Sequence, residues 1–145
     1  ARDLRAIVTA IHIVVELERI GDHARGIAKL AITLAAEPPL KPLIDVPRMA
    51  QISREMLRAG LQAYLDYDAD LAAQTALRDD EVDQLDEQVY RELLTFMISD
   101  PRTISRATYL LWVSHNLERI ADRITNICER VVFMVTGEIV ESGDR

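Results

Sequence analysis

The stretch Leu17-Glu18-Arg19-Ile20-Gly21-Asp22 recurs 100 positions later as Leu117-Glu118-Arg119-Ile120-Ala121-Asp122. The apolar residues around both copies also recur in one register, at steps of three and four. They are Ala10, Ile13, Leu17, Ile20, Ala24, Ile27, Ala31 and Leu34, then Leu110, Val113, Leu117, Ile120, Ile124, Ile127, Val131 and Met134. This spacing predicts a long helix around each copy, with an apolar seam that packs against other helices. A repeat that keeps its charged residues as well needs a reason beyond packing.

Each copy carries two acidic residues four positions apart. If Leu17 and Leu117 face the core, the next residue and the one four later point outward, because residues i and i+4 share a helix face. The sequence therefore predicts one acidic pair on an exposed stripe of each helix. The two pairs are Glu18 with Asp22, and Glu118 with Asp122.

A third acidic pair, Asp79 and Asp83, lies in the most acidic part of the chain. Because Val82 is a predicted core position, these two acids flank the core of a helix that must pack antiparallel to the last one. A rotation of that helix turns them toward Glu118 and Asp122. Four converging carboxylates would bind hard or borderline cations and could bridge more than one.

The donor set favours iron, manganese or magnesium, with zinc as a weaker choice because a closed structural zinc site needs Cys and His ligands. The alternative remains open that these acids form an ordinary solvated face. Arg19 can pair with Asp22, and Arg119 with Asp122, three positions apart.

Composition narrows the class of protein. The formal net charge of −7 argues against nucleic-acid binding and favours cations or a basic partner. No apolar stretch reaches the roughly 20 residues that a membrane helix needs, and no signal-peptide pattern opens the chain. The single cysteine, Cys128, is best interpreted as a small core residue, and it indicates a reducing compartment.

Pro, Gly and Asp residues divide the chain into four predicted helices. The first runs from about Asp3 to Ala36 and ends before Pro38 and Pro39. The second runs from near Pro47 to Tyr67, and the third follows a cap at Asp68 or Asp70 and continues through Phe96. The last occupies about Pro101 to Thr136 and stops at Gly137.

We therefore predict an all-α fold in which residues 48–137 form an up-down-up three-helix bundle. Residues 1–36 form the final helix of a second, incomplete bundle, residues 37–47 a linker, and residues 138–145 a tail. The first helix would expose its apolar seam if left alone, so we expect it to pack on this bundle or on a second copy of the chain. The chain begins without Met inside a helical pattern, so we expect the true N-terminus to lie upstream.

The sequence offers little for catalysis. No His has a Glu three residues before it, so the Glu-x-x-His pattern of di-iron bundles is absent, and we find no phosphate loop or nucleophile elbow. His23 follows Asp22 but points away by about 100°, which leaves it at the edge of any site. Trp112 and the four tyrosines are predicted to be core or core-edge residues.

The residues quoted above, together with Met97-Ile98-Ser99-Asp100-Pro101-Arg102-Thr103-Ile104 and Asn126-Ile127-Cys128-Glu129, resemble the PhoU family of phosphate-signalling regulators. The resemblance implies two similar three-helix bundles, so the chain resembles a PhoU protein that lacks its first two helices. It also implies metal binding at Glu/Asp-x-x-x-Asp motifs. By position these are Glu18 with Asp22, Asp79 with Asp83, and Glu118 with Asp122.

The resemblance further implies a cytoplasmic adaptor that is not an enzyme, and we also expect the chain to form a homodimer. It would restrain phosphate-starvation signalling between the ATPase of a phosphate ABC transporter and a sensor histidine kinase, with no membrane insertion of its own. Two alternatives stay open. One is a metal-dependent helical-bundle enzyme, and the other is a purely structural adaptor without metal.

Overall fold

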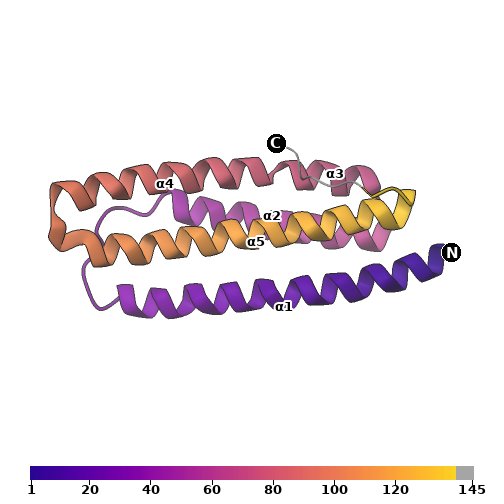
Figure 1. Ribbon diagram of the computed structural model, residues 1–145, viewed down its shortest axis with the longest axis horizontal. Helices are drawn as coiled ribbons and strands as arrows, with labels where there is room; N and C mark the ends of the chain where they lie inside the picture. The colour runs from indigo at the N-terminus through magenta and orange to yellow at the C-terminus, as the bar shows by residue number, and fades with distance from the viewer. Residues whose placement is uncertain (140–145) are drawn as a thin grey trace.

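The protein is all-α in the computed structural model, which describes residues 1–139 (Figure 1). The elements are α1 (Arg2–Leu34), α2 (Asp45–Asp66), α3 (Ala69–Leu77), α4 (Asp79–Ser99), the short 3₁₀ helix η1 (Pro101–Thr103) and α5 (Ile104–Thr136). The predicted fold class is therefore confirmed.

Helix α5 forms the centre of the molecule. It packs against α1 on one side and against α2, α3 and α4 on the other, with α1 set apart as the lowest helix in Figure 1. All of the apolar residues predicted around the second motif are buried, because α5 is covered from both sides. Around the first motif only Ile13 and Ile20 are buried, because α1 is covered on one side.

Helices α1 and α5 run antiparallel and meet in a symmetric register. Each of three cross-helix pairs has residue numbers that add up to 139: Thr9 Oγ1 donating to the Arg130 carbonyl at 3.5 Å, Glu16 beside Arg123 at 3.7 Å, and His23 beside Asn116 at 2.9 Å. Residues 16 and 123 are also the repeat equivalents of 116 and 23. A local twofold axis therefore relates the two helices, and the Glu16–Arg123 ion pair and the His23–Asn116 hydrogen bond occupy equivalent places.

The outer face of α1 is apolar and open. Ile7 and Val14 are 60% and 65% exposed, and Leu4, Val8, Ile11 and Val15 extend the same face. Their repeat equivalents on α5 include Ala107 and Ser114, which are fully buried against the other helices. Helix α1 thus packs on this bundle, which is one of the two predicted arrangements. Its outer apolar face is not covered by any of the described residues.

The linker lies two to three residues earlier in the chain than predicted. Helix α1 ends at Leu34 rather than at Ala36, and α2 begins at Asp45 rather than near Pro47. Proline is accepted in the first turn because the amide hydrogen that it lacks would have no partner inside the helix there. The connecting segment accordingly spans residues 35–44.

The predicted third helix is interrupted at Arg78. Its amide donates to the Thr75 carbonyl, and its own carbonyl accepts from Glu81, so both hydrogen bonds span three residues instead of four. Asp79, Asp80 and Glu81 then fill the first turn of α4, where negative charge is favourable against the helix dipole. The acidic run therefore starts a new helix instead of lying inside a continuous one. Asp68, one of the two predicted caps, caps α3 by accepting a hydrogen bond from the Leu71 amide.

The last helix begins and ends close to its predicted positions. Pro101 starts η1, Asp100 caps it by accepting from the Arg102 amide, and α5 follows directly. Gly137 closes α5 in the left-handed conformation with φ of 78°. Most of the predicted tail, residues 140–145, lies outside the described residues.

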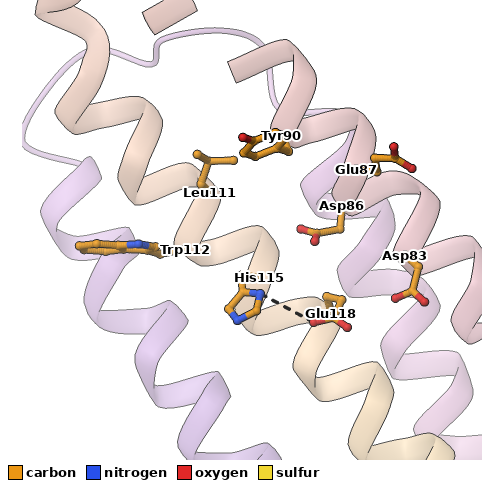
Figure 2. A pocket seen from close by; sticks show the side chains of 8 residues that line it. All are labelled: Asp83, Asp86, Glu87, Tyr90, Leu111, Trp112, His115 and Glu118. Atoms are coloured by element: carbon orange, nitrogen blue, oxygen red, sulfur yellow. Dashed lines mark ion pairs between the residues drawn. The ribbon is translucent and has the colours of Figure 1, made fainter. Parts of the chain in front are cut away.

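Trp112 and Tyr90, predicted to be core or core-edge residues, are 51% and 53% exposed, so neither belongs to the core. Tyr90 lies beside the seam between α4 and α5, whereas Trp112 projects from the side of α5 away from α4 (Figure 2). Cys128 is fully buried against α2, which confirms its interpretation as a core residue.

Candidate functional site

The start of α4 positions two carboxylates on the seam with α5. Val82 is fully buried, which fixes the rotation of this helix. Asp79 and Asp83 flank it, and Asp79 is half-buried while Asp83 stays more exposed. Their placement follows from the helical period, since residues three and four apart share one face.

Helix α5 supplies the facing acids. Leu117 and Ala121 are buried, and Glu118 and Asp122 come directly after them at the border of α4. Both side chains are half-buried, so the predicted exposed stripe is wrong for this copy of the motif. The reason is that α4 lies over the face that the isolated helix would show to water.

Three of the predicted ligands meet. Asp79, Asp83 and Asp122 each offer one carboxylate oxygen within 4.8 Å of the others. Oδ1 of Asp79 is buried and has no hydrogen-bond partner. Glu118 lies one helical turn before Asp122 on the same face and extends the cluster along α5. We call these four residues the acidic cluster.

The pKa values of Asp79, Asp83 and Glu118 in the acidic cluster are raised. Burial, followed by the charge of Asp83, raises the pKa of Asp79 to about 7. Burial, followed by the hydrogen bond to Asp122, raises the pKa of Glu118 to about 8. Burial and the charge of Asp122 also raise the pKa of Asp83. A cation would relieve this repulsion, and carboxylate oxygens are the ligands that hard cations prefer.

The first copy of the motif stands apart from the cluster. Glu18 and Asp22 are exposed on α1, and among the described residues no helix covers them. His23 turns toward Asn116 of α5. The structure therefore brings together the acids of α4 and α5 and leaves the pair on α1 separate.

A neighbouring acidic residue, Asp86, was missed by the sequence reasoning. It continues the stripe of Asp79 and Asp83 at helical spacing, and this spacing was a signal that could have identified it. Its carboxylate accepts a hydrogen bond from the buried hydroxyl of Ser114 on α5. Asp86 lies in a groove between α4 and α5 that Figure 2 shows from close by.

Fold and site together define the class: an all-α helical-bundle protein built on an internal repeat, with carboxylates gathered where its last two long helices meet. The chain belongs to the PhoU family. It matches the PhoU domain over residues 1–31 and 46–131.

Relatives and solved structures agree with this assignment. Proteins named phosphate-specific transport system accessory protein PhoU homolog are 43% identical in Caulobacter vibrioides, over 98% of this chain and 62% of the relative, and in Aquifex aeolicus, over 97% and 64%. The crystal structure of PhoU from Pseudomonas aeruginosa superposes with a TM-score of 0.90 at 38% identity, covering 95% of this chain and 66% of that one. The chain thus spans a little over three fifths of the curated relatives' length.

A second crystal structure, of the phosphate transport system regulatory protein PhoU from Streptococcus pneumoniae, superposes with a TM-score of 0.87 at 32% identity. It covers 97% of this chain and 67% of that one. Within residues 1–139, no helix combines the length and apolar character that crossing a bilayer requires.

Proposed function

We propose that this chain belongs to a metal-binding regulator of phosphate transport. In this proposal it restrains phosphate-starvation signalling on the cytoplasmic side, as a homodimeric adaptor between the ATPase of a phosphate transporter and a sensor histidine kinase. Support for the phosphate system comes from the family and from the names of the relatives. Those names describe accessory proteins, which agrees with a role that is not enzymatic.

The observation that carries metal binding is the convergence of Asp79, Asp83 and Asp122 from two helices. Three carboxylates this close repel one another unless protons or a cation neutralise them. The unpartnered, buried Oδ1 of Asp79 supplies a lone pair that the protein itself does not use. Glu118 is placed to serve as a further ligand or as a bridge to a second ion.

The donor set points to a hard cation. All four groups are carboxylates, which suit magnesium, manganese and iron. Within the described residues, no cysteine or histidine joins the three converging aspartates, which disfavours a closed zinc site. A bound cation would neutralise the charge of the cluster, and it would change the surface that the seam presents to a partner.

The metal site is tested by replacing the two acids on α5. We expect Glu118→Ala with Asp122→Ala to keep the helical circular dichroism of the parent and to lose metal in elemental analysis after incubation with Mn²⁺ or Fe²⁺. The matched control is Glu18→Ala with Asp22→Ala, the same motif on α1, which should keep the metal content of the parent. Equal metal content in both double variants would contradict the site.

Thermal melting provides an independent measurement. A ligand that binds only the folded protein raises the unfolding midpoint, so Mn²⁺ should stabilise the parent and the control but not the Glu118/Asp122 variant. No shift for the parent would favour a structural adaptor without metal. The regulatory role is tested by binding of the intact chain to the transporter ATPase and to the cytoplasmic part of the kinase. Absence of binding to both would contradict that role.

A further inference from the structure

A cavity of about 350 Å³ lies along α5 at the start of α4. Asp79 and Asp122 of the acidic cluster form part of its lining. The other lining residues are all on α5 and none of them is acidic: Arg119, Arg123, Thr125 and Asn126. We call this space the arginine cavity.

Helical spacing places the arginines and the asparagine around one metal-ligand candidate. Residues 119, 122, 123 and 126 follow the i, i+3, i+4 and i+7 pattern, so they share one face of α5. Asp122 thus lies among three side chains that donate hydrogen bonds. A ligand in the arginine cavity therefore borders both these donors and the carboxylates that would hold a cation.

The protein itself leaves these donors unused. Among the described residues, the side chains of Arg119 and Asn126 have no hydrogen-bond or ion-pair partner, so the ion pair of Arg119 with Asp122 that the sequence allows does not form. Arg123 has only Glu16, whose Oε2 lies 3.7 Å from its Nη1, and its Nε is buried without a partner. Unsatisfied polar groups are rare in folded proteins, and a missing ion or water is one explanation for them.

The donor set belongs to the second copy of the duplicated motif alone. Arg119 recurs on α1 as Arg19, but the positions equivalent to the other two donors hold His23 and Gly26. Arg19 is therefore an exposed arginine of the same motif without the companions that line the cavity on α5. It serves as an internal control for Arg119.

The charges of the site make anion binding depend on a cation. The three aspartates that converge outnumber the two arginines, and Glu16 also faces Arg123, so the metal-free cluster repels an anion. A cation held by the aspartates reverses this balance, because a bound ion is the largest local charge of such a site. This inference therefore rests on the proposed metal binding.

A phosphate ion fits this combination of groups. Guanidinium groups donate pairs of parallel hydrogen bonds to phosphate oxygens. Hydrogen phosphate also carries an O–H group, which can donate to a carboxylate oxygen of the lining, whereas sulfate and the dianion of a phosphate monoester lack this hydrogen. We propose that the arginine cavity binds inorganic phosphate when a metal ion occupies the acidic cluster, with Arg119, Arg123 and Asn126 as donors.

Titration calorimetry on the intact chain tests this proposal. Protein loaded with stoichiometric Mn²⁺ is titrated at neutral pH with inorganic phosphate, with sulfate and with the peptide acetyl-Gly-phosphoserine-Gly-amide, and the phosphate titration is repeated after removal of the metal. We expect saturable phosphate binding by the loaded protein alone, and weaker binding of sulfate and of the peptide. No binding up to about 1 mM phosphate, equal binding without metal, or equal or tighter binding of sulfate or the peptide would overturn the proposal.

A matched pair of variants locates the site. Arg119→Gln removes a donor without removing a metal ligand, and it should weaken phosphate binding by about tenfold, the size expected for charge-assisted hydrogen bonds. Arg19→Gln, the repeat equivalent on α1, should bind phosphate like the parent. An unchanged affinity of Arg119→Gln, or an equal loss in both variants, would overturn the assignment.

Elemental analysis of the same samples separates this proposal from metal binding. Arg119→Gln should keep the Mn²⁺ content of the parent, and loss of Mn²⁺ from this variant would overturn the role of Arg119 as a phosphate ligand. A parent that holds Mn²⁺ but does not bind phosphate would overturn the arginine cavity alone. A parent that holds no Mn²⁺ would overturn the metal site and this proposal with it.

Discussion

Replacing Glu118 by Gln should stabilise the metal-free protein at alkaline pH. The side chain sits between α4 and α5, beside Asp122 and close to Asp83 and Asp86. Glutamine keeps nearly the same shape and hydrogen-bonding capacity but carries no charge. The substitution therefore removes the repulsion while leaving the packing of the seam in place.

The magnitude follows from the pKa of Glu118, which is about 8 in the folded protein against 4.5 in a free side chain. Such a difference corresponds to about 5 kcal/mol for a group that water cannot reach. Since 20% of the Glu118 side chain is exposed, solvent screening reduces the effect to about 2 kcal/mol. Because the folded pKa is the higher one, the stabilisation by the proton is fully present below about pH 4.5 and is lost as the pH rises through 8.

The assay is thermal unfolding followed by circular dichroism, in the presence of a chelator, at pH 5 and pH 9. The midpoint of Glu118→Gln should exceed that of the parent by about 6 °C at pH 9 and only slightly at pH 5. Glu18→Gln, the repeat equivalent on the exposed face of α1, should have the same thermal midpoint as the parent at both pH values. Equal midpoints of Glu118→Gln and parent at pH 9, or the same increase for Glu18→Gln, would refute the reasoning.

Three further predictions concern the core. Ile124→Ala should lower the free energy of unfolding, measured by urea denaturation, by about 3 kcal/mol, because the Ile124 side chain is fully buried. Ile32→Ala, at a position that is 75% exposed, should change the free energy of unfolding by less than about 0.5 kcal/mol. Gly60→Ala should destabilise the parent by about 1 kcal/mol, because the new methyl group would lie 3.2 Å from Cys128 Sγ. The same change should be stabilising in a Cys128→Ala background, where only the helix propensity of alanine remains, and a double-mutant cycle without coupling would contradict this contact. Burial raises the pKa of the Cys128 thiol to about 12, so it should react with a disulfide reagent at pH 8 only after unfolding.

The sequence predicted the long helices well because their periodicity is strong. The residues assigned to the seam of the last helix are buried from Leu110 to Met134. The same reasoning placed Asp79 and Asp83 beside Val82 and turned them toward α5, and the structure shows that geometry. Helical spacing was sufficient here, because it determines which residues share a face.

Spacing does not determine what covers a face, and the predictions of side-chain exposure failed for this reason. Glu118 was expected to be exposed because the residue pattern of its own helix does not show that α4 packs over it. Trp112 and Tyr90 were expected in the core or at its edge, but each is more than half exposed because no described helix covers it. The interruption at Arg78 was missed because the apolar pattern continues through it, and only the hydrogen bonds reveal the change.

The duplicated motif serves as an internal comparison of sequence and environment. Glu18 and Glu118 follow the same leucine in the same motif, yet one is exposed and the other is half-buried with a pKa of about 8. Nothing within the motif accounts for this difference. The deciding element is α4, which brings Asp79 and Asp83 to one copy, while no described helix covers the other. The acidic cluster is therefore a product of the packing of α4 on α5, and a substitution that loosens Val82 should weaken metal binding even though it removes no carboxylate.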